Sequence, residues 1–153
     1  MASEQRLDTY AVDPQAFKAV YGLEKYVQES GLDPNLYELV KIRASQLNGC
    51  AYCLDMHTRD ARKKGEQQRR LDILSAWREA PSMFTEAEQA ALALTESVTL
   101  IGQEGVPDEV WDRAAAQFGE TDLVHLLMAI AVINVWNRLA VATHQSLPED
   151  PGE

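Results

Sequence analysis

The chain has 153 residues, 46% of them hydrophobic and 25% charged, and a formal net charge of −10 at pH 7. This composition is ordinary for a globular protein, and the length is enough for one domain over residues 1–153 with a substantial core. Nucleic acids and anionic membranes recruit proteins with clustered cations, so the acidic balance argues against a general binder of either. Residues 1–10 carry neither the basic nor the apolar region of a secretory signal, so we expect a cytoplasmic protein.

Helical periodicity runs through nearly the whole chain, and no segment alternates as a strand does. Asp33 and Pro34 are the N-cap and first residue expected at a helix start. Asn48 is placed to cap the next helix, and Thr85 with Glu88 forms a capping box. The predicted fold class is therefore all-α. The expected helices cover residues 15–29, 34–47, 49–64, 67–77, 86–101, 107–118 and 121–144.

The most apolar segment, residues 123–142, is long enough to cross a membrane. His125, Asn134, Asn137 and Arg138 interrupt it, and no adjoining polybasic flank sets an orientation, so we expect a buried helix instead. A helix that is apolar around most of its circumference is central in its own domain or shared with a partner subunit. We therefore expect the chain to oligomerise through its helices.

Cys50 and Cys53 are the two cysteines of the chain, and His57 follows four positions after the second. In a reducing compartment, a lone CxxC pair is more often redox-active or metal-binding than a permanent disulfide. Cys50 falls in the expected first helical turn, where unpaired N–H groups and the helix dipole favour a thiolate. His57 lies one turn from Cys53 but about 10 Å along the axis from Cys50. The spacing indicates one thiol with a base beside it and a second thiol that can resolve it.

A regular helix would keep these two thiols apart. Residues at i and i+3 hold their Cβ atoms about 5–6 Å apart, which exceeds the roughly 3.5–4.5 Å of a relaxed disulfide. Closing a bond between Cys50 and Cys53 therefore requires a local shift of the helix start, which is easier in a first turn than in the middle of a helix.

Two other interpretations of the cysteines stay open. The helix face that they share is apolar, and free cysteines behave as small buried hydrophobes. A structural zinc site needs four ligands, and the remaining candidates are His125, His144 and acids such as Glu38, without a second pair at zinc-site spacing. His125 also fits a core histidine, and His144 fits a cation at a helix C-terminus. Helical periodicity places Glu38 at the edge of the apolar stripe and predicts that it is solvated.

At the cysteine motif the sequence resembles the AhpD-like alkylhydroperoxidases of the carboxymuconolactone decarboxylase superfamily. The family signature is a glutamate, a CxxC beginning twelve positions later, and a histidine four positions after the second cysteine; here these are Glu38, Cys50, Cys53 and His57. The segments FTEAEQAALALTE and INVWNRLAVA are also similar to family segments. The resemblance covers about residues 15–145 and implies an all-helical domain that assembles as a homotrimer or homohexamer.

The resemblance also implies a chemistry. Cys53 would be the peroxidatic thiol, oxidised by a hydroperoxide to a sulfenic acid, and Cys50 would resolve it as a disulfide. An external dithiol, such as a lipoyl group or a thioredoxin-like protein, would reduce that disulfide. Glu38 and His57 would relay protons, and no cofactor or metal is implied beyond the dithiol itself. Tyr52 stands between the cysteines, where the characterised peroxidase of the family has a histidine.

Two function hypotheses follow. The first is a CxxC-dependent alkyl hydroperoxide reductase in antioxidant defence. The alternative is a redox-sensing or disulfide-exchange module without significant peroxidase turnover. The decarboxylase branch of the superfamily lacks the CxxC, so we do not expect lactone decarboxylation.

Overall fold

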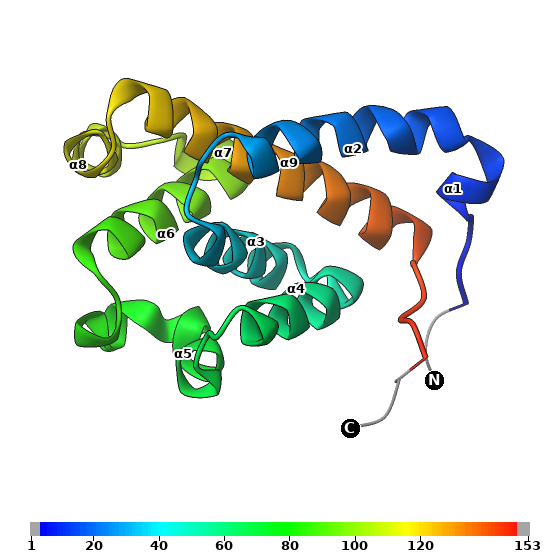
Figure 1. Ribbon diagram of the computed structural model, residues 1–153, viewed down its shortest axis with the longest axis horizontal. Helices are drawn as coiled ribbons and strands as arrows, with labels where there is room; N and C mark the ends of the chain where they lie inside the picture. The colour runs from blue at the N-terminus through cyan, green and yellow to red at the C-terminus, as the bar shows by residue number, and fades with distance from the viewer. Residues whose placement is uncertain (1–3, 150–153) are drawn as a thin grey trace.

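The computed structural model describes residues 4–149, and every regular element in that range is a helix, as predicted (Figure 1). Seven helices carry most of the fold, and four short elements connect or precede them. In chain order the elements are α1 (Thr9–Val12), α2 (Pro14–Glu29), α3 (Pro34–Asn48), α4 (Ala51–Lys63), α5 (Gln68–Ile73), the 3₁₀ helices η1 (Leu74–Glu79) and η2 (Pro81–Met83), α6 (Glu86–Thr99), α7 (Ile101–Glu104), α8 (Asp108–Gln117) and α9 (Glu120–Thr143).

Local capping chemistry sets several helix starts. The Asp33 carboxylate accepts a hydrogen bond from the N–H of Asn35, and Pro34 follows as the first residue of α3. Proline loses nothing there, because the first N–H of a helix has no partner within the helix. At α6, Thr85 and Glu88 form both hydrogen bonds of the predicted capping box. These starts are therefore fixed by residues adjacent in sequence.

Two predictions about helix boundaries are wrong. The expected helix at 67–77 is divided into α5 and η1, and η1 itself kinks at Ala76. Asn48 ends α3 instead of capping α4, because its side-chain amide donates to Asn134 and Asn137 of α9, at 3.0 and 2.9 Å. The short helices α1 and α7 were not predicted, since four residues are too few to show helical periodicity.

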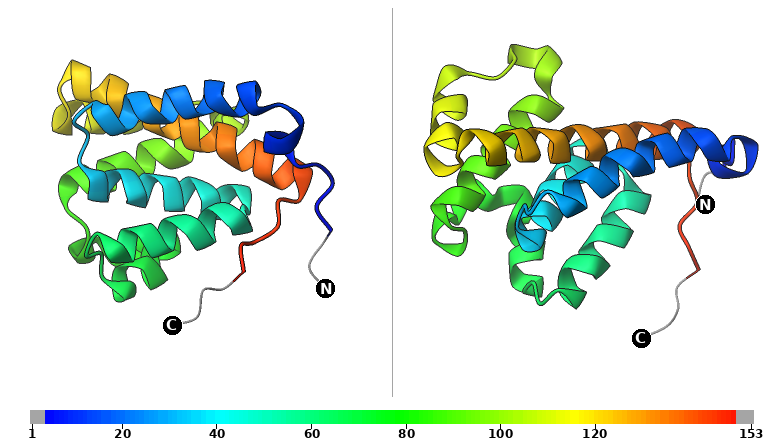
Figure 2. Two further views of the ribbon diagram at one scale, coloured as in Figure 1. Left: turned by 45° about the vertical axis from the view of Figure 1, so that its right-hand side comes forward. Right: turned by 45° about the horizontal axis from the view of Figure 1, so that its top comes forward.

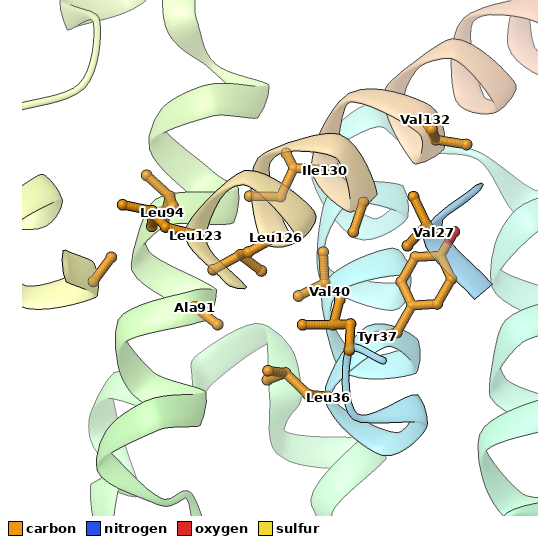
Figure 3. Close-up of a cluster of buried hydrophobic side chains, with 13 residues drawn as sticks. Val27, Leu36, Tyr37, Val40, Ala91, Leu94, Leu123, Leu126, Ile130 and Val132 are labelled. Atoms are coloured by element: carbon orange, nitrogen blue, oxygen red, sulfur yellow. The ribbon is translucent and has the colours of Figure 1, made fainter. Parts of the chain in front are cut away.

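The helices α3 and α9 form the centre of the bundle. α3 packs against α4, α6 and α9, while α9 also contacts α2, α4, α6 and α8. Both views in Figure 2 show α2 running alongside α9 over α3 and α4. Figure 3 shows side chains meeting in one buried cluster, among them Val40 of α3, Leu94 of α6, and Leu126 and Ile130 of α9. Burial of each such aliphatic side chain stabilises the fold by about 1.5–3 kcal/mol.

Within residues 4–149, α9 is the one helix long and apolar enough to cross a membrane by length and composition. The core helix of a globular protein meets the same criterion. Leu126, Ile130 and Ile133 of α9 are fully buried against other helices of the bundle, whereas Val124 and Leu139 are exposed. The packing supports the prediction of a central helix in its own domain.

Candidate active site

The turn between α3 and α4 brings the two cysteines together. Gly49 has a left-handed backbone (φ 66°), which ends α3 and redirects the chain. Cys50 then adopts an extended conformation as the N-cap of α4, and its Sγ accepts a hydrogen bond from the N–H of Cys53 at 3.3 Å. The Cα atoms of Cys50 and Cys53 are 5.4 Å apart, and their sulfurs form a disulfide.

Cys50 is therefore placed one step earlier than the sequence predicted, ahead of the first helical turn and outside the helix. This placement supplies the shift of the helix start that disulfide closure requires. Both sulfur-bearing residues are buried. The N–H of Cys53 points at the Cys50 sulfur at the N-terminus of α4, so a thiolate formed there on reduction is stabilised by the helix terminus.

Glu38 and His57 form a buried pair beside Cys53. Glu38 is only 2% exposed, so the prediction of a solvated side chain is wrong. The reason is that α4 covers the side of α3 which periodicity assigns to solvent. Glu38 Oε2 lies 3.2 Å from His57 Nδ1, and neither atom has another hydrogen-bond partner among the described residues. The two residues, twelve positions before and four after the CxxC, thus meet in space.

Two lysines complete the charge balance around Glu38. Its Oε1 lies 2.5 Å from Lys64 Nζ and 3.5 Å from Lys41 Nζ. Burial alone would raise the pKa of Glu38, but the His57 imidazole, the Lys41 charge and the hydrogen bond from Lys64 outweigh it and lower the pKa to about 2. Glu38 is consequently ionised at neutral pH and can stabilise a positive charge on His57.

Lys41 connects this pair to a second buried carboxylate on α2. Its Nζ lies 3.3 Å from Glu24 and 3.7 Å from the centre of the Tyr37 ring. Tyr37 donates its hydroxyl hydrogen to Glu24 at 2.8 Å, and Trp136 of α9 donates its indole N–H at 3.2 Å. Burial, followed by the charge of Glu24, raises the pKa of Tyr37 far above its usual range, so its hydroxyl remains a donor.

Sequence reasoning missed Lys41 and Glu24. Each is a charged residue on a helix that was predicted from the spacing of its apolar residues alone. The one available signal was the spacing of Lys41, which follows Glu38 by three positions and so shares its helix face. The contact between Lys41 and Glu24 depends on how α2 packs, and the spacing of residues along the chain does not predict it.

A cavity of about 530 Å³ opens onto this cluster. Cys53, His57 and Glu38 line it, whereas Cys50 does not. Most of the remaining wall is apolar and aromatic, formed by residues that include Phe17, Tyr21, Val27, Met56 and Trp136. The cavity therefore offers an organic molecule an apolar surface with one sulfur and a proton-transferring pair at its side.

Metal binding fits the cluster poorly. Glu38, His57 and Asp60 offer ligand atoms within 4.8 Å of one another. However, a cation there would compete with the ammonium groups of Lys41 and Lys64 for Glu38. The cluster is better suited to moving protons than to holding a metal, because the charge of the Glu38 carboxylate is already neutralised by the two lysines.

The remaining histidines lie away from Glu38. His125 is partly buried, with Nδ1 3.6 Å from Asp122 and its ring edge-on to Tyr26. It is thus packed within the bundle, although less deeply than the prediction of a core histidine implied. His144 follows the last residue of α9 as its C-cap, as predicted from its position, and has a left-handed backbone. Neither side chain shares the cavity with Cys53.

Comparison with known proteins assigns the family. Residues 14–97 match the carboxymuconolactone decarboxylase family. The chain belongs to this family. The uncharacterized protein YdfG of Bacillus subtilis is 44% identical over 138 residues, which are 90% of this chain and 93% of YdfG. The uncharacterized protein YnjA of Escherichia coli is 28% identical over 108 residues, which are 71% of this chain and 58% of YnjA.

Solved structures narrow the assignment within the carboxymuconolactone decarboxylase family. A protein of unknown function from Agrobacterium tumefaciens, named as a candidate antioxidant defence protein AhpD, is 40% identical, with a TM-score of 0.93 over 96% of this chain and all of that one. The debrominase Bmp8 has a TM-score of 0.81 at 21% identity, over 92% of this chain and 75% of its own, and shows the fold alone. The chain is therefore an AhpD-like member, and the resemblance drawn from its motif is confirmed.

Proposed function

We propose that this protein is a CxxC-dependent peroxidase that reduces organic hydroperoxides. One observation carries the proposal: Cys53 lines the 530 Å³ cavity together with His57 and Glu38, whereas Cys50 does not. An attacking thiol needs a substrate surface and a proton-transferring group, and within this pair Cys53 has both. Cys53 is thus the attacking thiol, Cys50 the resolving thiol, and Glu38 with His57 the proton relay.

The oxidative steps balance with the residues at the site. The Cys53 thiolate attacks the terminal oxygen of the hydroperoxide, the O–O bond breaks, and the leaving alkoxide takes a proton from His57. The product is an alcohol and a sulfenic acid on Cys53. The Cys50 thiol then attacks the Cys53 sulfur, water leaves, and the Cys50–Cys53 disulfide forms. Ionised Glu38 stabilises the imidazolium of His57 before the proton is transferred.

The apolar wall supports an organic substrate. Phe17, Tyr21 and Trp136 offer aromatic surface close to the polar cluster, and burial of an alkyl or aryl group there contributes to binding in proportion to its area. Hydrogen peroxide lacks such a group and would gain nothing from this wall. The substrate class is therefore an alkyl or aryl hydroperoxide.

Steady-state consumption of cumene hydroperoxide, with dithiothreitol as reductant, tests the proposal. We expect Cys53→Ser to reduce the rate by at least about 100-fold, because serine does not attack peroxide oxygen at neutral pH. In Cys50→Ser, sulfenic acid on Cys53 should accumulate and react with dimedone. Equal rates in the wild type and Cys53→Ser would overturn the role of Cys53.

The alternative function uses the same disulfide as a signal. Reversible formation of the Cys50–Cys53 bond with negligible peroxide turnover would favour a redox-sensing or disulfide-exchange module. Both functions need a dithiol reductant such as a lipoyl or thioredoxin-like protein, and we place both in the cytoplasm. The same experiment separates them, since only the peroxidase consumes many equivalents of peroxide per chain.

We also propose a homotrimer or homohexamer assembled through helices. Large apolar side chains stay exposed on α2 and α9, among them Tyr21, Leu23, Val124 and Leu139. Exposed apolar surface of this kind is common at subunit interfaces. Light scattering should give three or six times the monomer mass, and a monomer at micromolar concentration would contradict the proposal.

A further inference from the structure

A second cavity, of about 440 Å³, reaches the other cysteine of the disulfide. It is lined by Cys50 but not by Cys53, the reverse of the first cavity. Other lining residues include Ala51, Val141, His144 and Leu147, from the start of α4, the end of α9 and the segment that follows α9. Each sulfur of the disulfide therefore has its own cavity.

The two cavities share part of their lining. Tyr52, Ala140 and Gln145 line both of them. Tyr52, the residue between the cysteines, is half-buried and thus has a side on each cavity. A molecule bound in one cavity consequently meets a different sulfur from a molecule bound in the other.

The two cavities differ in the chemistry that they support. Cleaving an O–O bond requires a proton donor for the leaving oxygen, and the Glu38–His57 pair lines only the first cavity. Attack on a disulfide requires a thiolate and access to one sulfur along the extension of the S–S bond. The second cavity provides access to Cys50, and His144 in its wall can accept the proton of an incoming thiol.

We infer that the dithiol reductant approaches through the second cavity and attacks Sγ of Cys50, so that oxidation and reduction use different sulfurs and different cavities. This inference rests on the proposed function for the role of Cys53 in oxidation. The reductant's thiol arm must be slender, because Cys50 is buried at the wall of a cavity of modest volume.

The reductive steps balance as follows. One thiol of the reductant gives its proton to His144 and its sulfur bonds to the Cys50 sulfur, while the S–S bond breaks and Cys53 leaves as a thiolate with the electron pair. His57 takes a proton from solvent to replace the one that it gave to the alkoxide during oxidation. The second thiol of the reductant then attacks its own sulfur in the mixed disulfide, which releases Cys50. The N–H of Cys53 and the start of α4 stabilise the Cys50 thiolate as it leaves. The reductant becomes a cyclic disulfide, and the protein regains both thiols.

Trapping the mixed disulfide in the unmodified protein tests which sulfur is attacked. The disulfide form is prepared with diamide, exposed to 2-mercaptoethanol in the presence of iodoacetamide, and fragmented by mass spectrometry. We expect the mercaptoethanol adduct on Cys50 and the alkyl group on Cys53, in at least about tenfold excess over the reverse pattern. A predominance of the adduct on Cys53 would overturn the inference.

A matched pair of variants tests the route. Val141 lines only the second cavity and is 43% exposed, and Met56 lines only the first and is 39% exposed. Val141→Trp should slow reduction of the disulfide by dithiothreitol at least about tenfold and leave oxidation by cumene hydroperoxide unchanged. Met56→Trp should slow oxidation and leave reduction unchanged.

Unchanged reduction in Val141→Trp, or equal slowing in both variants, would contradict the separate routes. These results are distinguishable from a failure of the proposed function. If the wild type does not consume hydroperoxide, diamide still forms the disulfide, and the trapping and reduction measurements still report which sulfur and which cavity the thiol uses.

Discussion

Two carboxylates, the buried Glu38 on α3 and the partly buried Glu96 on α6, have similar surroundings and different consequences. Glu96 lies 2.8 Å from Arg43 and from the indole nitrogen of Trp77, and also contacts Arg78. As at Glu38, burial opposes ionisation of Glu96, but hydrogen bonds from Arg78, Trp77 and Arg43 outweigh it and lower its pKa. A lowered carboxylate pKa is therefore not sufficient to mark a site.

The difference lies in what donates to each carboxylate. Arginine and indole groups keep their protons at any physiological pH, so the cluster around Glu96 joins α3, η1 and α6 without proton transfer. Glu38 instead contacts the imidazole of His57, which can release a proton, and both line a cavity with Cys53. The donor's chemistry and access to a cavity separate the functional cluster from the structural one.

Neutralising each carboxylate should separate these roles most strongly. Glu38→Gln keeps the shape and an acceptor oxygen but removes the charge that stabilises imidazolium. We expect kcat/KM for cumene hydroperoxide to fall about 100-fold to 1,000-fold, within the range of general acid–base catalysis. Stopped-flow oxidation of the reduced protein measures this loss directly.

Glu96→Gln is the matched control. Removing its charge leaves Arg43 largely buried without a counter-charge, so the free energy of unfolding should fall by about 3 kcal/mol. Peroxide oxidation at 25 °C should change less than about twofold, because this cluster touches no reacting atom. A large kinetic effect of Glu96→Gln would break the distinction between the two clusters.

Acid titration of stability should also reveal Glu38. Its pKa of about 2 in the folded protein lies below the ordinary glutamate value of 4.5, so its ionisation stabilises the fold above about pH 4.5. That contribution, about 3 kcal/mol, should be lost as the pH falls from 4.5 towards 2. Urea unfolding of the wild type and Glu38→Gln across this window measures the difference, and parallel curves would contradict the assignment.

Lys41→Met should have a smaller, pH-dependent effect. Without the Lys41 charge the pKa of Glu38 rises from about 2 by roughly 1–3 units, so the acid limb of the kcat/KM profile should move to higher pH and activity at pH 5 should fall by up to about twofold. Lys41→Arg should restore most of the lost activity at pH 5. Lys25→Met, at an exposed lysine whose one ion pair within residues 4–149 is with Glu29, is the control and should leave the profile unchanged.

Replacing the most exposed cation of each cluster should give the smallest effects. Lys64 at Glu38 is 42% exposed and Arg78 at Glu96 is 57% exposed. Each replacement by alanine should lower the free energy of unfolding by less than about 1 kcal/mol, since water screens exposed pairs. Thermal unfolding measures both, and a loss above about 2 kcal/mol in either would show that the outer ion pair is not screened.

The amino-acid sequence predicted the elements that local rules determine. Asp33-Pro34, the Thr85 capping box and the spacing of Cys53 and His57 are set by neighbours along one helix, and they are found where expected. These features depend on residues close together in the sequence, so they can be predicted without knowing how the helices pack.

The buried charges could not be predicted in the same way. Helical periodicity treats a charged position as solvated, but α3 is enclosed by α4, α6 and α9, so Glu38 and Lys41 lie between helices. Their burial is possible because Glu24 and Glu38 share the Lys41 charge, and that pairing depends on α2 far along the chain. The N-cap position of Cys50 likewise depends on one left-handed residue, Gly49.

A single-turnover reaction tests the central claim most directly. Reduced protein is mixed with one equivalent of cumene hydroperoxide, and free thiols, alcohol and peptide masses are measured together. The account predicts one equivalent of alcohol, loss of both thiols per chain and a Cys50–Cys53 cross-link, with none of the three in Cys53→Ser. Retention of both thiols while peroxide decays no faster than in buffer would contradict it.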